Sequence, residues 1–387
     1  VVDNNNRESS VYSVSVTTDY VNPTVRITST SKTSNSITVY YSGTAGSKSV
    51  SYYKVSCNSG STYNNSYTTS YTCSGLSGST TYGIRVIAVD TGGVQSSAAT
   101  TSVTTNTAYP TLAAKVKSLY TSQGSNGIYY HTSSLANGAG DNSYRYAGAN
   151  PNNYVCFGST ASTCPSANLY RIIGVYGDQV KLIHATYATT AEIGTAAHDS
   201  SNYFYWSGSS SNTSNTWSSS TLNTNSLNGT FLTNLGTTWT NKIATTTWYV
   251  GGMEVAKIKS PSTVKTTHNY EVGANKSSTT YNAKIGLPYA NEYGYAADPS
   301  YWTTELMNYE SSLSTNWMGN GNHFWTISRV LDDSDTKFFV YSTGYVYYNR
   351  DDELSASFRV RPSFNLVSSV KTSGGTGTQS DPYRIEL

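Results

Sequence analysis

Short stretches in which apolar and polar residues alternate follow one another over the first third of the chain. Each is followed by turn residues, and they cover positions 24–28, 36–41, 50–56, 67–73, 82–89 and 98–104. An alternation of period two places successive side chains on opposite faces of a sheet, and short strands at this spacing are typical of two packed sheets. The pattern therefore predicts a β-sandwich over residues 23–108.

One more alternating pattern lies before this sandwich, within residues 1–22. Polar residues separate five side chains that favour strands, namely Tyr12, Val14, Val16, Thr18 and Tyr20. Residues 3–7 have the composition of a turn. Because a lone strand is marginal in water, this segment needs a sheet to join, and we predict that these five side chains form an assembly strand.

Residues 1–24 also align without a gap with residues 88–111, at an offset of 87 positions that places Asp3 on Asp90. A fixed period is the mark of tandem repeats. The later copy closes the predicted sandwich. Residues 1–22 are therefore expected to be either the terminal strand of a preceding immunoglobulin-like repeat or a donor strand that joins the sheet of another subunit. The second alternative predicts self-association between identical subunits.

A different composition begins at Pro110, and residues 109–387 form the second predicted domain. Apolar spacing predicts helices at 112–119 and 222–235. Strands are expected at 169–176 and 179–183, which form a hairpin, and within 281–295, 324–329, 338–348 and 358–366. The predicted fold class is thus mostly β, a sandwich followed by a larger, β-rich α+β domain.

Composition narrows the range of partners. Charged residues make up only 12% of the chain and the net charge is +2, without a basic cluster, so nucleic acid is not an expected partner. No apolar run approaches the roughly 18 residues that a membrane span needs. The 35 tyrosines provide enough apolar area for a core, which argues against disorder.

The four cysteines form two close pairs, Cys57 with Cys73 and Cys156 with Cys164. Four cysteines allow three connectivities, of which pairing within each predicted domain leaves one. No second cysteine or histidine pair accompanies them at zinc-site spacing. Two disulfides predict an oxidising, extracellular location.

Residues 75–90 carry a glycine-leucine turn, then Tyr82, then the alternating aliphatic residues Ile84, Val86 and Ala88. This run resembles the corner and penultimate strand of fibronectin type III modules. The resemblance implies that Tyr82 is the corner tyrosine, with a buried ring and a hydroxyl bonded to backbone upstream, and that the aliphatic residues face the core. The cysteine pair and the lack of an early tryptophan depart from that family, so a bacterial immunoglobulin-like repeat remains an alternative.

Several runs in the second domain resemble bacterial surface modules of the C-type-lectin and formylglycine-generating-enzyme kind. They are IGLPY at 285–289, YGYAA at 293–297, WTISR at 325–329, GYV at 344–346, RVRPSFNL at 359–366 and DPYRI at 381–385. The resemblance implies a lectin-like fold, and it gives fold better than function. Formylglycine-generating relatives use cysteines late in the chain, whereas here none follows Cys164.

We predict no catalytic residue, metal or cofactor. No nucleophile, zinc-peptidase or phosphate-loop motif is present. Five scattered histidines are expected at the surface, namely His131, His184, His198, His268 and His323. Two acidic groups, at 332–335 and 351–353, are consistent with calcium ligands but favour solvated turns because they lack the pattern of an EF-hand loop.

Three tryptophans, Trp302, Trp317 and Trp325, are the candidate platforms for a sugar ring. Against this, Asn150-Pro151-Asn152 only faintly echoes the sugar-binding motif of C-type lectins. Tryptophans in such a fold are also more often part of the core.

The chain is expected to be a non-enzymatic protein of a bacterial surface, with a stalk, a lectin-like head and assembly into a filament by strand addition. The alternative is a monomeric adhesin whose second domain binds a glycan or a host surface protein.

Overall fold

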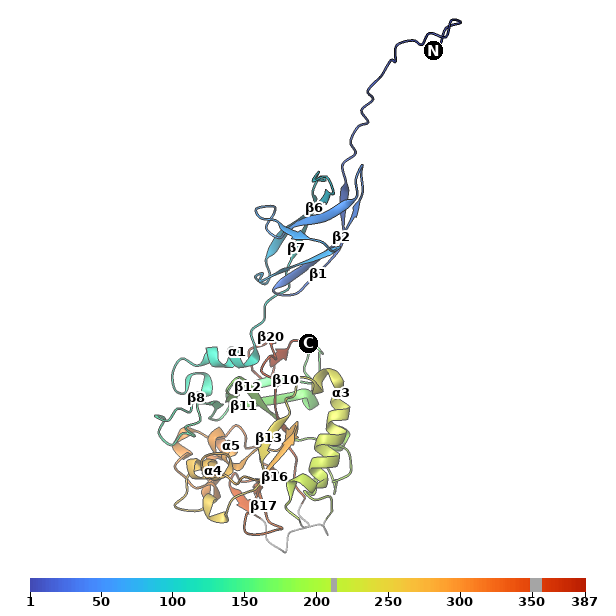
Figure 1. Ribbon diagram of the computed structural model, residues 1–387. Helices are drawn as coiled ribbons and strands as arrows, with labels where there is room; N and C mark the ends of the chain where they lie inside the picture. The colour runs from blue at the N-terminus through green and yellow to red at the C-terminus, as the bar shows by residue number, and fades with distance from the viewer. Residues whose placement is uncertain (210–213, 349–356) are drawn as a thin grey trace. The chain divides into compact units, whose positions relative to one another are not determined.

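The computed structural model describes residues 1–209, 214–348 and 357–387. The chain divides into two compact units, Val1–Ala108 and Tyr109–Leu387, which are treated separately below (Figure 1). This division agrees with the boundary predicted near Pro110.

Two antiparallel sheets form the sandwich of the first unit. One sheet has the order β1-β2-β5, with β1 (Thr24–Lys32), β2 (Ser36–Thr44) and β5 (Ser70–Ser74). The other has the order β4-β3-β6-β7, with β4 (Asn64–Ser66), β3 (Val50–Ser56), β6 (Thr81–Asp90) and β7 (Ala99–Thr104). The six predicted strands are present, and the pattern at 67–73 corresponds to β5.

The core of the sandwich lies between the two sheets. Ile84, Val86 and Ala88 on β6 are fully buried, and the first two share one core cluster with Ile37 and Val39 on β2. These side chains are buried together because they are spaced two residues apart, and every second side chain of a strand points to the same face of the sheet. The predicted inward face of this strand is confirmed.

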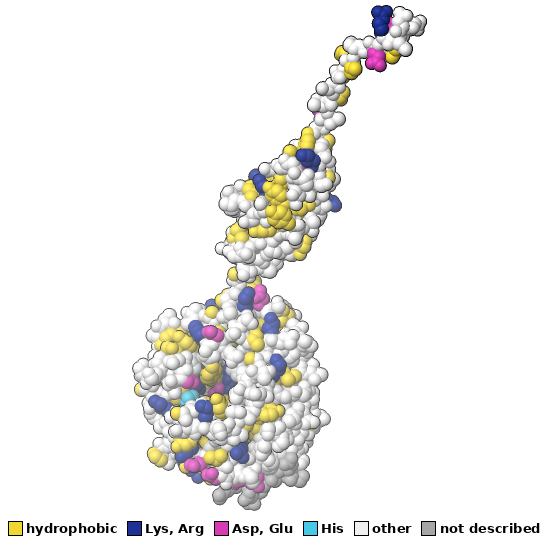
Figure 2. Space-filling model, viewed as in Figure 1, with side chains coloured by type: hydrophobic (Ala, Val, Ile, Leu, Met, Phe, Trp, Pro, Cys, Tyr) yellow, Lys and Arg dark blue, Asp and Glu magenta, His cyan; other side chains and the backbone are white. Residues whose placement is uncertain are grey.

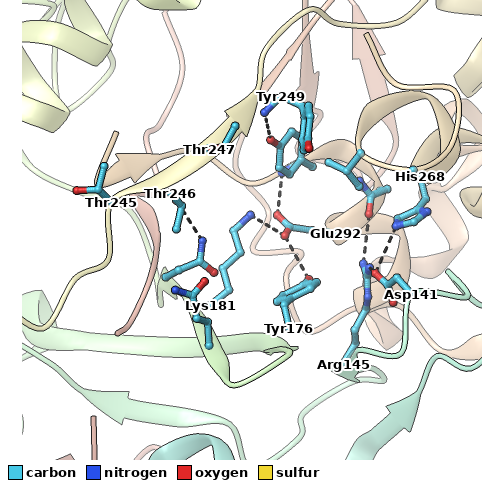
Figure 3. Close-up of a pocket in the computed structure, with 16 residues that line it drawn as sticks. Asp141, Arg145, Tyr176, Lys181, Thr245, Thr246, Thr247, Tyr249, His268 and Glu292 are labelled. Atoms are coloured by element: carbon cyan, nitrogen blue, oxygen red, sulfur yellow. Dashed lines mark hydrogen bonds and ion pairs between the residues drawn. The ribbon is translucent and has the colours of Figure 1, made fainter. Parts of the chain in front are cut away.

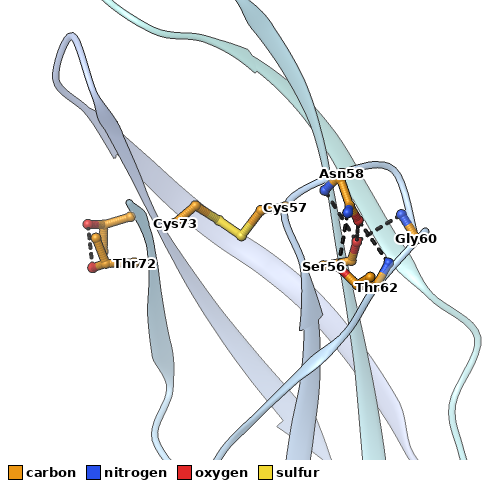
Figure 4. The surroundings of a disulfide bond; sticks show 8 residues. Ser56, Cys57, Asn58, Gly60, Thr62, Thr72 and Cys73 are labelled. Atoms are coloured by element: carbon orange, nitrogen blue, oxygen red, sulfur yellow. Dashed lines mark hydrogen bonds between the residues drawn. A yellow bond between two sulfur atoms is a disulfide. The ribbon is translucent and has the colours of Figure 1, made fainter. Parts of the chain in front are cut away.

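A disulfide joins the two sheets. Cys57 directly follows β3, Cys73 lies in β5, and their Cα atoms are 6.0 Å apart (Figure 4). Beside it, the Ser56 hydroxyl oxygen accepts a hydrogen bond from the Gly60 N–H at 2.8 Å and holds the loop that leaves β3. The predicted pairing of these cysteines is confirmed.

Residues 9–22 form no strand in this structure of a single chain, and the predicted assembly strand, which needs a partner sheet, stays a prediction. Tyr12, Val14 and Val16 are 90%, 66% and 80% exposed. The physical reason is the absence of a neighbouring strand, since backbone N–H and C=O groups need a partner to form a ladder. The turn predicted at residues 3–7 is present.

A nine-stranded sheet forms the centre of the second unit. Its main path runs β15 (Ile285–Gly286), β19 (Ser363–Asn365), β12 (Gln179–His184), β11 (Leu169–Tyr176), β10 (Tyr154–Cys156), β21 (Tyr383–Ile385) and β20 (Thr372–Gly374). Beside β11 lie β9 (Tyr144–Tyr146) and then β8 (Ile128–Tyr130). The predicted β11–β12 hairpin is thus central to the sheet.

Smaller sheets and helices surround this centre. The sheets are β13 (Thr246–Tyr249) with β14 (Thr280–Ala283), and β16 (Phe324–Arg329) with β17 (Lys337–Val340) and β18 (Val346–Tyr348). The helices are α1 (Leu112–Leu119), α2 (Thr190–Ile193), the π-helical η4 (Leu222–Phe231), α3 (Leu232–Thr240), α4 (Val264–Glu271) and α5 (Ala290–Ala296). Short 3₁₀ turns are η1 (Ser125–Gly127), η2 (Ser166–Asn168), η3 (Trp217–Ser219), η5 (Val255–Ile258), η6 (Pro299–Tyr301), η7 (Leu306–Asn308) and η8 (Glu310–Thr315).

The sequence predicts strand structure within the segment 281–295. The structure instead has two short strands there, followed by α5. The helix begins after Tyr289, where the Glu292 carboxylate accepts the Tyr289 N–H at 2.9 Å and caps the first turn. This local cap, together with the burial of every residue of α5, outweighs the low helix propensity of tyrosine and glycine. The prediction of a mostly β chain is confirmed, and the second unit is a mixture of helices and strands.

Two buried arginines hold backbone carbonyls inside the second unit. Arg361 donates to His184 O at 3.0 Å, Met318 O at 2.6 Å and Ala185 O at 3.1 Å. Arg171 donates to Trp317 O at 3.0 Å and Pro151 O at 3.2 Å. The fork of a guanidinium fits several carbonyls at once, so these side chains fix loops that lack regular structure.

The second disulfide, Cys156–Cys164, closes the loop between β10 and η2, as predicted. Within the described residues, none of the helices has the length and apolar character required to cross a bilayer.

Candidate functional site

A cleft of about 580 Å³ opens into the second unit between the β11–β12 hairpin, β13, α4 and α5 (Figure 3). In the space-filling view, acidic and basic side chains and a histidine gather in a hollow of this unit (Figure 2). A concave site with convergent polar side chains is the usual form of a ligand pocket. The cleft is therefore the candidate site.

One side of the cleft is built on the ion pair between Lys181 on β12 and Glu292 on α5. The Lys181 Nζ lies 2.6 Å from Glu292 Oε1, and the two side chains are only 5% and 4% exposed. The same ammonium lies 4.7 Å from the centre of the Trp248 ring and 4.8 Å from that of Tyr289. The Tyr176 hydroxyl donates to Glu292 at 3.3 Å, so the carboxylate receives several donors.

A second ion pair, between Arg145 on β9 and Asp141, forms the opposite side. The distance from Arg145 Nη2 to Asp141 Oδ2 is 2.5 Å. The guanidinium also donates to Ser143 Oγ at 2.8 Å and to Asn291 Oδ1 at 3.2 Å. Burial by itself would raise the pKa of Asp141, but Arg145 and the hydrogen bonds outweigh it and hold that pKa well below its usual range.

His268 on α4 completes this side of the cleft. Its Nε2 lies 3.4 Å from Asp141 Oδ2, and the side chain is 5% exposed. Burial lowers the pKa of His268, although Asp141 opposes the change. The imidazole is therefore neutral near pH 7 and offers a hydrogen-bonding group without a charge.

His131 lies behind it, with its ring against Tyr295 and Trp302. Its Nδ1 accepts the Ala139 N–H at 3.0 Å. Burial lowers the pKa of His131 well below that of a free histidine, and the charge of Arg145 adds to this effect. The prediction of surface histidines is wrong for His131, His184 and His268, which are buried, because each ring fills a packing position in the core.

The floor of the cleft rests on Glu271, the last residue of α4. Its carboxylate accepts the backbone N–H groups of Ala290 at 3.0 Å and Asn291 at 2.7 Å, and it is also bonded to the Ser328 hydroxyl. Burial raises the pKa of Glu271 against the effect of these donors. The bonds join the end of α4 to the start of α5 and so position Asn291 and Glu292.

The rim of the cleft carries uncharged polar groups. Gln179 stands at the start of β12, Thr246 and Tyr249 come from β13, and Asn365 ends β19. Asn365 Nδ2 lies 3.4 Å from Thr246 Oγ1. The charges of the inner wall pair with one another, so a ligand would meet hydroxyl, amide and aromatic groups first.

The comparisons with known proteins concern the first unit. Residues 21–104 match the family described as "Fibronectin type III domain". This segment is a fibronectin type III domain. Residues 109–387 remain without an assigned family, and the lectin-like module expected there is not identified. A search of curated proteins found no match to the chain.

Three solved structures align with about a quarter of this chain or less. The structure titled "Structure of FN3tt mut" is 27% identical over 22% of this chain and 98% of its own, with a TM-score of 0.19. "Crystal Structure of FN3tt" is 25% identical over 24% of this chain and all of its own, with a TM-score of 0.20. The fibronectin(III)-like modules of Clostridium thermocellum CbhA are 13% identical over 22% of this chain and 98% of theirs, with a TM-score of 0.19.

Within the fibronectin type III domain, Tyr82 makes the hydrogen bond to upstream backbone that the resemblance implied, but its ring is not fully buried as expected. Its hydroxyl oxygen accepts the Ser77 N–H at 2.8 Å, and its ring is half-buried beside the core. No side-chain cluster of this domain resembles the cleft of the second unit.

The three tryptophans proposed as sugar platforms are buried. Trp302, Trp317 and Trp325 are 1%, 4% and 3% exposed, and each indole N–H donates to a backbone carbonyl. A ring without an exposed face cannot stack on a sugar. The structure therefore contradicts their role as surface platforms and assigns them to the core.

The acidic segment 332–335 forms a turn, in which Asp333 accepts the Asp335 N–H at 3.1 Å and the Thr336 hydroxyl at 2.8 Å. The segment 351–353 lies outside the described residues. In the part of the chain that the structure describes, no group of three or more potential metal ligands occurs.

Sequence reasoning missed the cleft because its charged residues lie far apart along the chain. Of the paired residues Lys181 and Glu292, Lys181 could have been noticed in the sequence, because it is a charged residue between the apolar Val180 and Leu182 of a predicted strand. A charge within a buried strand is rare unless it is paired. The partner, Glu292, lies 111 residues away.

Proposed function

We propose that this chain is an extracellular, non-enzymatic surface protein in which the fibronectin type III domain is a spacer and the second unit binds a glycan. The single observation that carries the proposal is the polar cleft between the β11–β12 hairpin and α5. The lectin-like architecture expected from the motifs at 285–289 and 359–366 belongs to the same proposal. Two disulfides support an extracellular, oxidising location.

The charge pattern favours a neutral ligand. Lys181 is bonded to Glu292 and Arg145 to Asp141, so each charge of the inner wall already has its counterion. An anionic or cationic ligand would have to compete with a buried ion pair, which is costly. Sugar hydroxyls both donate and accept, and they match the uncharged groups of Gln179, Thr246, Tyr249 and Asn365.

The same pattern favours binding over hydrolysis. Glycoside hydrolysis requires one carboxylic acid that keeps its proton near neutral pH, beside a second carboxylate. Asp141 is held ionised by Arg145, and Glu292 accepts from the Lys181 ammonium at 2.6 Å. Neither of these groups is arranged to carry a proton to a leaving oxygen, and the Glu271 carboxylate, whose pKa burial raises, is bonded to the backbone of α5 and does not line the cleft.

A glycan array probed with the full chain tests the proposal. The variant Gln179→Trp places a bulky side chain at the rim, and it is expected to abolish binding while the melting temperature stays unchanged. Thr237→Trp is the matched control, because Thr237 is exposed on α3 and does not line the cleft. Absence of binding to neutral glycans, or equal binding by Gln179→Trp, would overturn the proposal.

A further inference from the structure

The turn at residues 3–7 repeats, bond for bond, the turn that follows β6 in the fibronectin type III domain. Asp3 Oδ1 accepts the N–H groups of Asn5 and Arg7, both at 2.9 Å. Asp90 Oδ1 accepts those of Gly92 at 2.8 Å and Val94 at 2.9 Å. In each copy the acceptor binds the second and the fourth residue after it.

The backbone of the two turns is also the same. The Asp3 N–H donates to Arg7 O and the Asn6 N–H to Asp3 O, both at 3.0 Å. The equivalent bonds from Asp90 to Val94 and from Gly93 to Asp90 are both 3.0 Å. Asn6 and Gly93 occupy the same left-handed position, with φ of 57° and 82°. Such a backbone favours glycine and asparagine, which explains the two residue types.

The residues after each turn also correspond. In the domain, the turn leads into β7, whose Val103 points into the core and is 8% exposed, and Thr105 beyond it is 3% exposed. At the offset of 87 positions these inward positions are Val16 and Thr18. Tyr12 and Val14 fall in the same way on Ala99 and Thr101, both half-buried. Residues 12–18 therefore have side chains that favour burial at the same positions at which the last strand of the domain faces its core.

We infer that residues 1–18 are the last strand of a fibronectin type III sandwich, with its preceding turn, and that they bind a sandwich of this type in which that strand is missing. In such a partner the penultimate strand presents unpaired N–H and C=O groups, as β6 would without β7. Tyr12 would then stand opposite the position of Val86, because Ala99 pairs with Val86. The turn fixes the register in which this strand pairs with that sheet.

This chain's own domain is not the fitting partner. Its β6 is already paired along its outer edge with β7, from Thr81–Thr104 to Val86–Ala99. A second copy with an intact β7 is closed in the same way. The inference therefore departs from the expected self-association through this domain, because the partner must be a sandwich whose last strand position is vacant.

The connection between this segment and the domain is anchored. Tyr20 donates its hydroxyl to the Asp90 carboxylate. The Val21 N–H donates to Ser47 Oγ at 2.9 Å, and the Ser47 N–H donates to Val21 O at 2.8 Å. Residues 20 and 21 are thus attached to the domain, while residues 10–18 belong to no strand and make no backbone–backbone hydrogen bond within the part of the chain that the structure describes.

A transplant within the full chain tests the equivalence of the two strands. Residues 90–105 are replaced by a copy of residues 3–18, and in a control by residues 4–19, which turns the apolar side chains to the wrong face. The in-register chimera differs from the wild type at nine positions. It is expected to melt cooperatively within about 15 °C of the wild type, a range typical of moderate destabilisation in a small domain. The shifted control is expected to lose the transition of the fibronectin type III domain.

The in-register chimera could fail only because Tyr12 is too large for the position of Ala99, so a second measurement is needed. The variant Val103→Asp weakens β7 in the full chain, and a synthetic peptide of residues 1–20 is added. The peptide is expected to raise the melting temperature of the variant, whereas a peptide with Val14→Asp and Val16→Asp is not. If the peptide has no effect and the in-register chimera melts like the shifted control, the inference is overturned.

Discussion

The ammonium group of Lys181 and the carboxylate of Glu292 lie 2.6 Å apart inside the second unit, with both side chains almost inaccessible to solvent. Lys181 belongs to the central sheet and Glu292 to the first turn of α5. The pair therefore joins the sheet to the helix at the wall of the cleft. Its energetic role differs from that of a surface ion pair, because a buried charge without its partner is strongly disfavoured.

Glu292→Gln is expected to destabilise the second unit by about 3–5 kcal/mol, the range found when one partner of a buried ion pair is removed. The glutamine still accepts the Tyr289 N–H, so the loss reflects the unpaired Lys181. Urea denaturation measures the change. Lys117→Ala, which breaks the ion pair with the exposed Asp178, is the control and should leave the midpoint nearly unchanged. Equal effects of the two variants would contradict the prediction.

The second unit is expected to lose stability as the pH falls below about 6.5, the pKa of histidine in an unfolded chain. Burial lowers the pKa of both His131 and His268, so below that pH the unfolded chain binds two protons that the folded chain does not. Stability then decreases by up to about 2.7 kcal/mol per pH unit, down to the pKa values of the folded state.

Urea midpoints at pH 7, 6 and 5 measure this dependence. The double variant His131→Asn, His268→Asn removes both groups, and asparagine can still accept the Ala139 N–H that His131 binds. Its midpoints should change less with pH than those of the wild type. Parallel curves for the two proteins would show that these histidines are not the cause.

Trp302→Ala is expected to destabilise the second unit by about 3–5 kcal/mol, as is usual for the loss of a large buried aromatic side chain. Trp302 packs against Tyr129 and Tyr295 and is 1% exposed. Thermal unfolding followed by near-ultraviolet circular dichroism checks this. A variant that stays fully stable but loses glycan binding would restore Trp302 as a ligand platform.

Each disulfide is expected to stabilise only its own unit. Replacing Cys57 and Cys73 by serine opens a loop with a sequence separation of 16 and should cost the fibronectin type III domain about 3 kcal/mol. Opening Cys156–Cys164, with a separation of 8, should cost the second unit somewhat less. Calorimetry on the full chain resolves the two transitions. A serine pair that shifts both transitions would contradict independent units.

The parts of the fold that the sequence predicts well are those with local signals. The strands of the fibronectin type III domain follow from a period of two, because every second side chain, such as Ile84 and Val86, contacts the core. The hairpin of β11 and β12 has its turn at Gly177, where a positive φ of 59° favours glycine. Both signals lie within a few residues of the structure they specify.

The candidate site depends on contacts that no local pattern contains. Arg145 meets Asn291 across 146 positions, and Lys181 meets Glu292 across 111. The sequence does not show which tyrosines and tryptophans are exposed, since an aromatic ring can either pack in the core or bind a sugar at the surface. Trp302 and Trp325 became core residues because their indole N–H groups find backbone carbonyls.

The inward placement of Arg145, Arg171, Lys181, Lys337 and Arg361 also determines what the second unit presents to its surroundings. Only 12% of the residues of the chain are charged, and these five turn away from solvent. Most of the visible surface consists of uncharged side chains and backbone (Figure 2). Long-range electrostatic attraction or repulsion therefore contributes little to an encounter with this unit. Its association rates with partners should be nearly the same at low and at high salt concentration, because there is little surface charge for salt to screen.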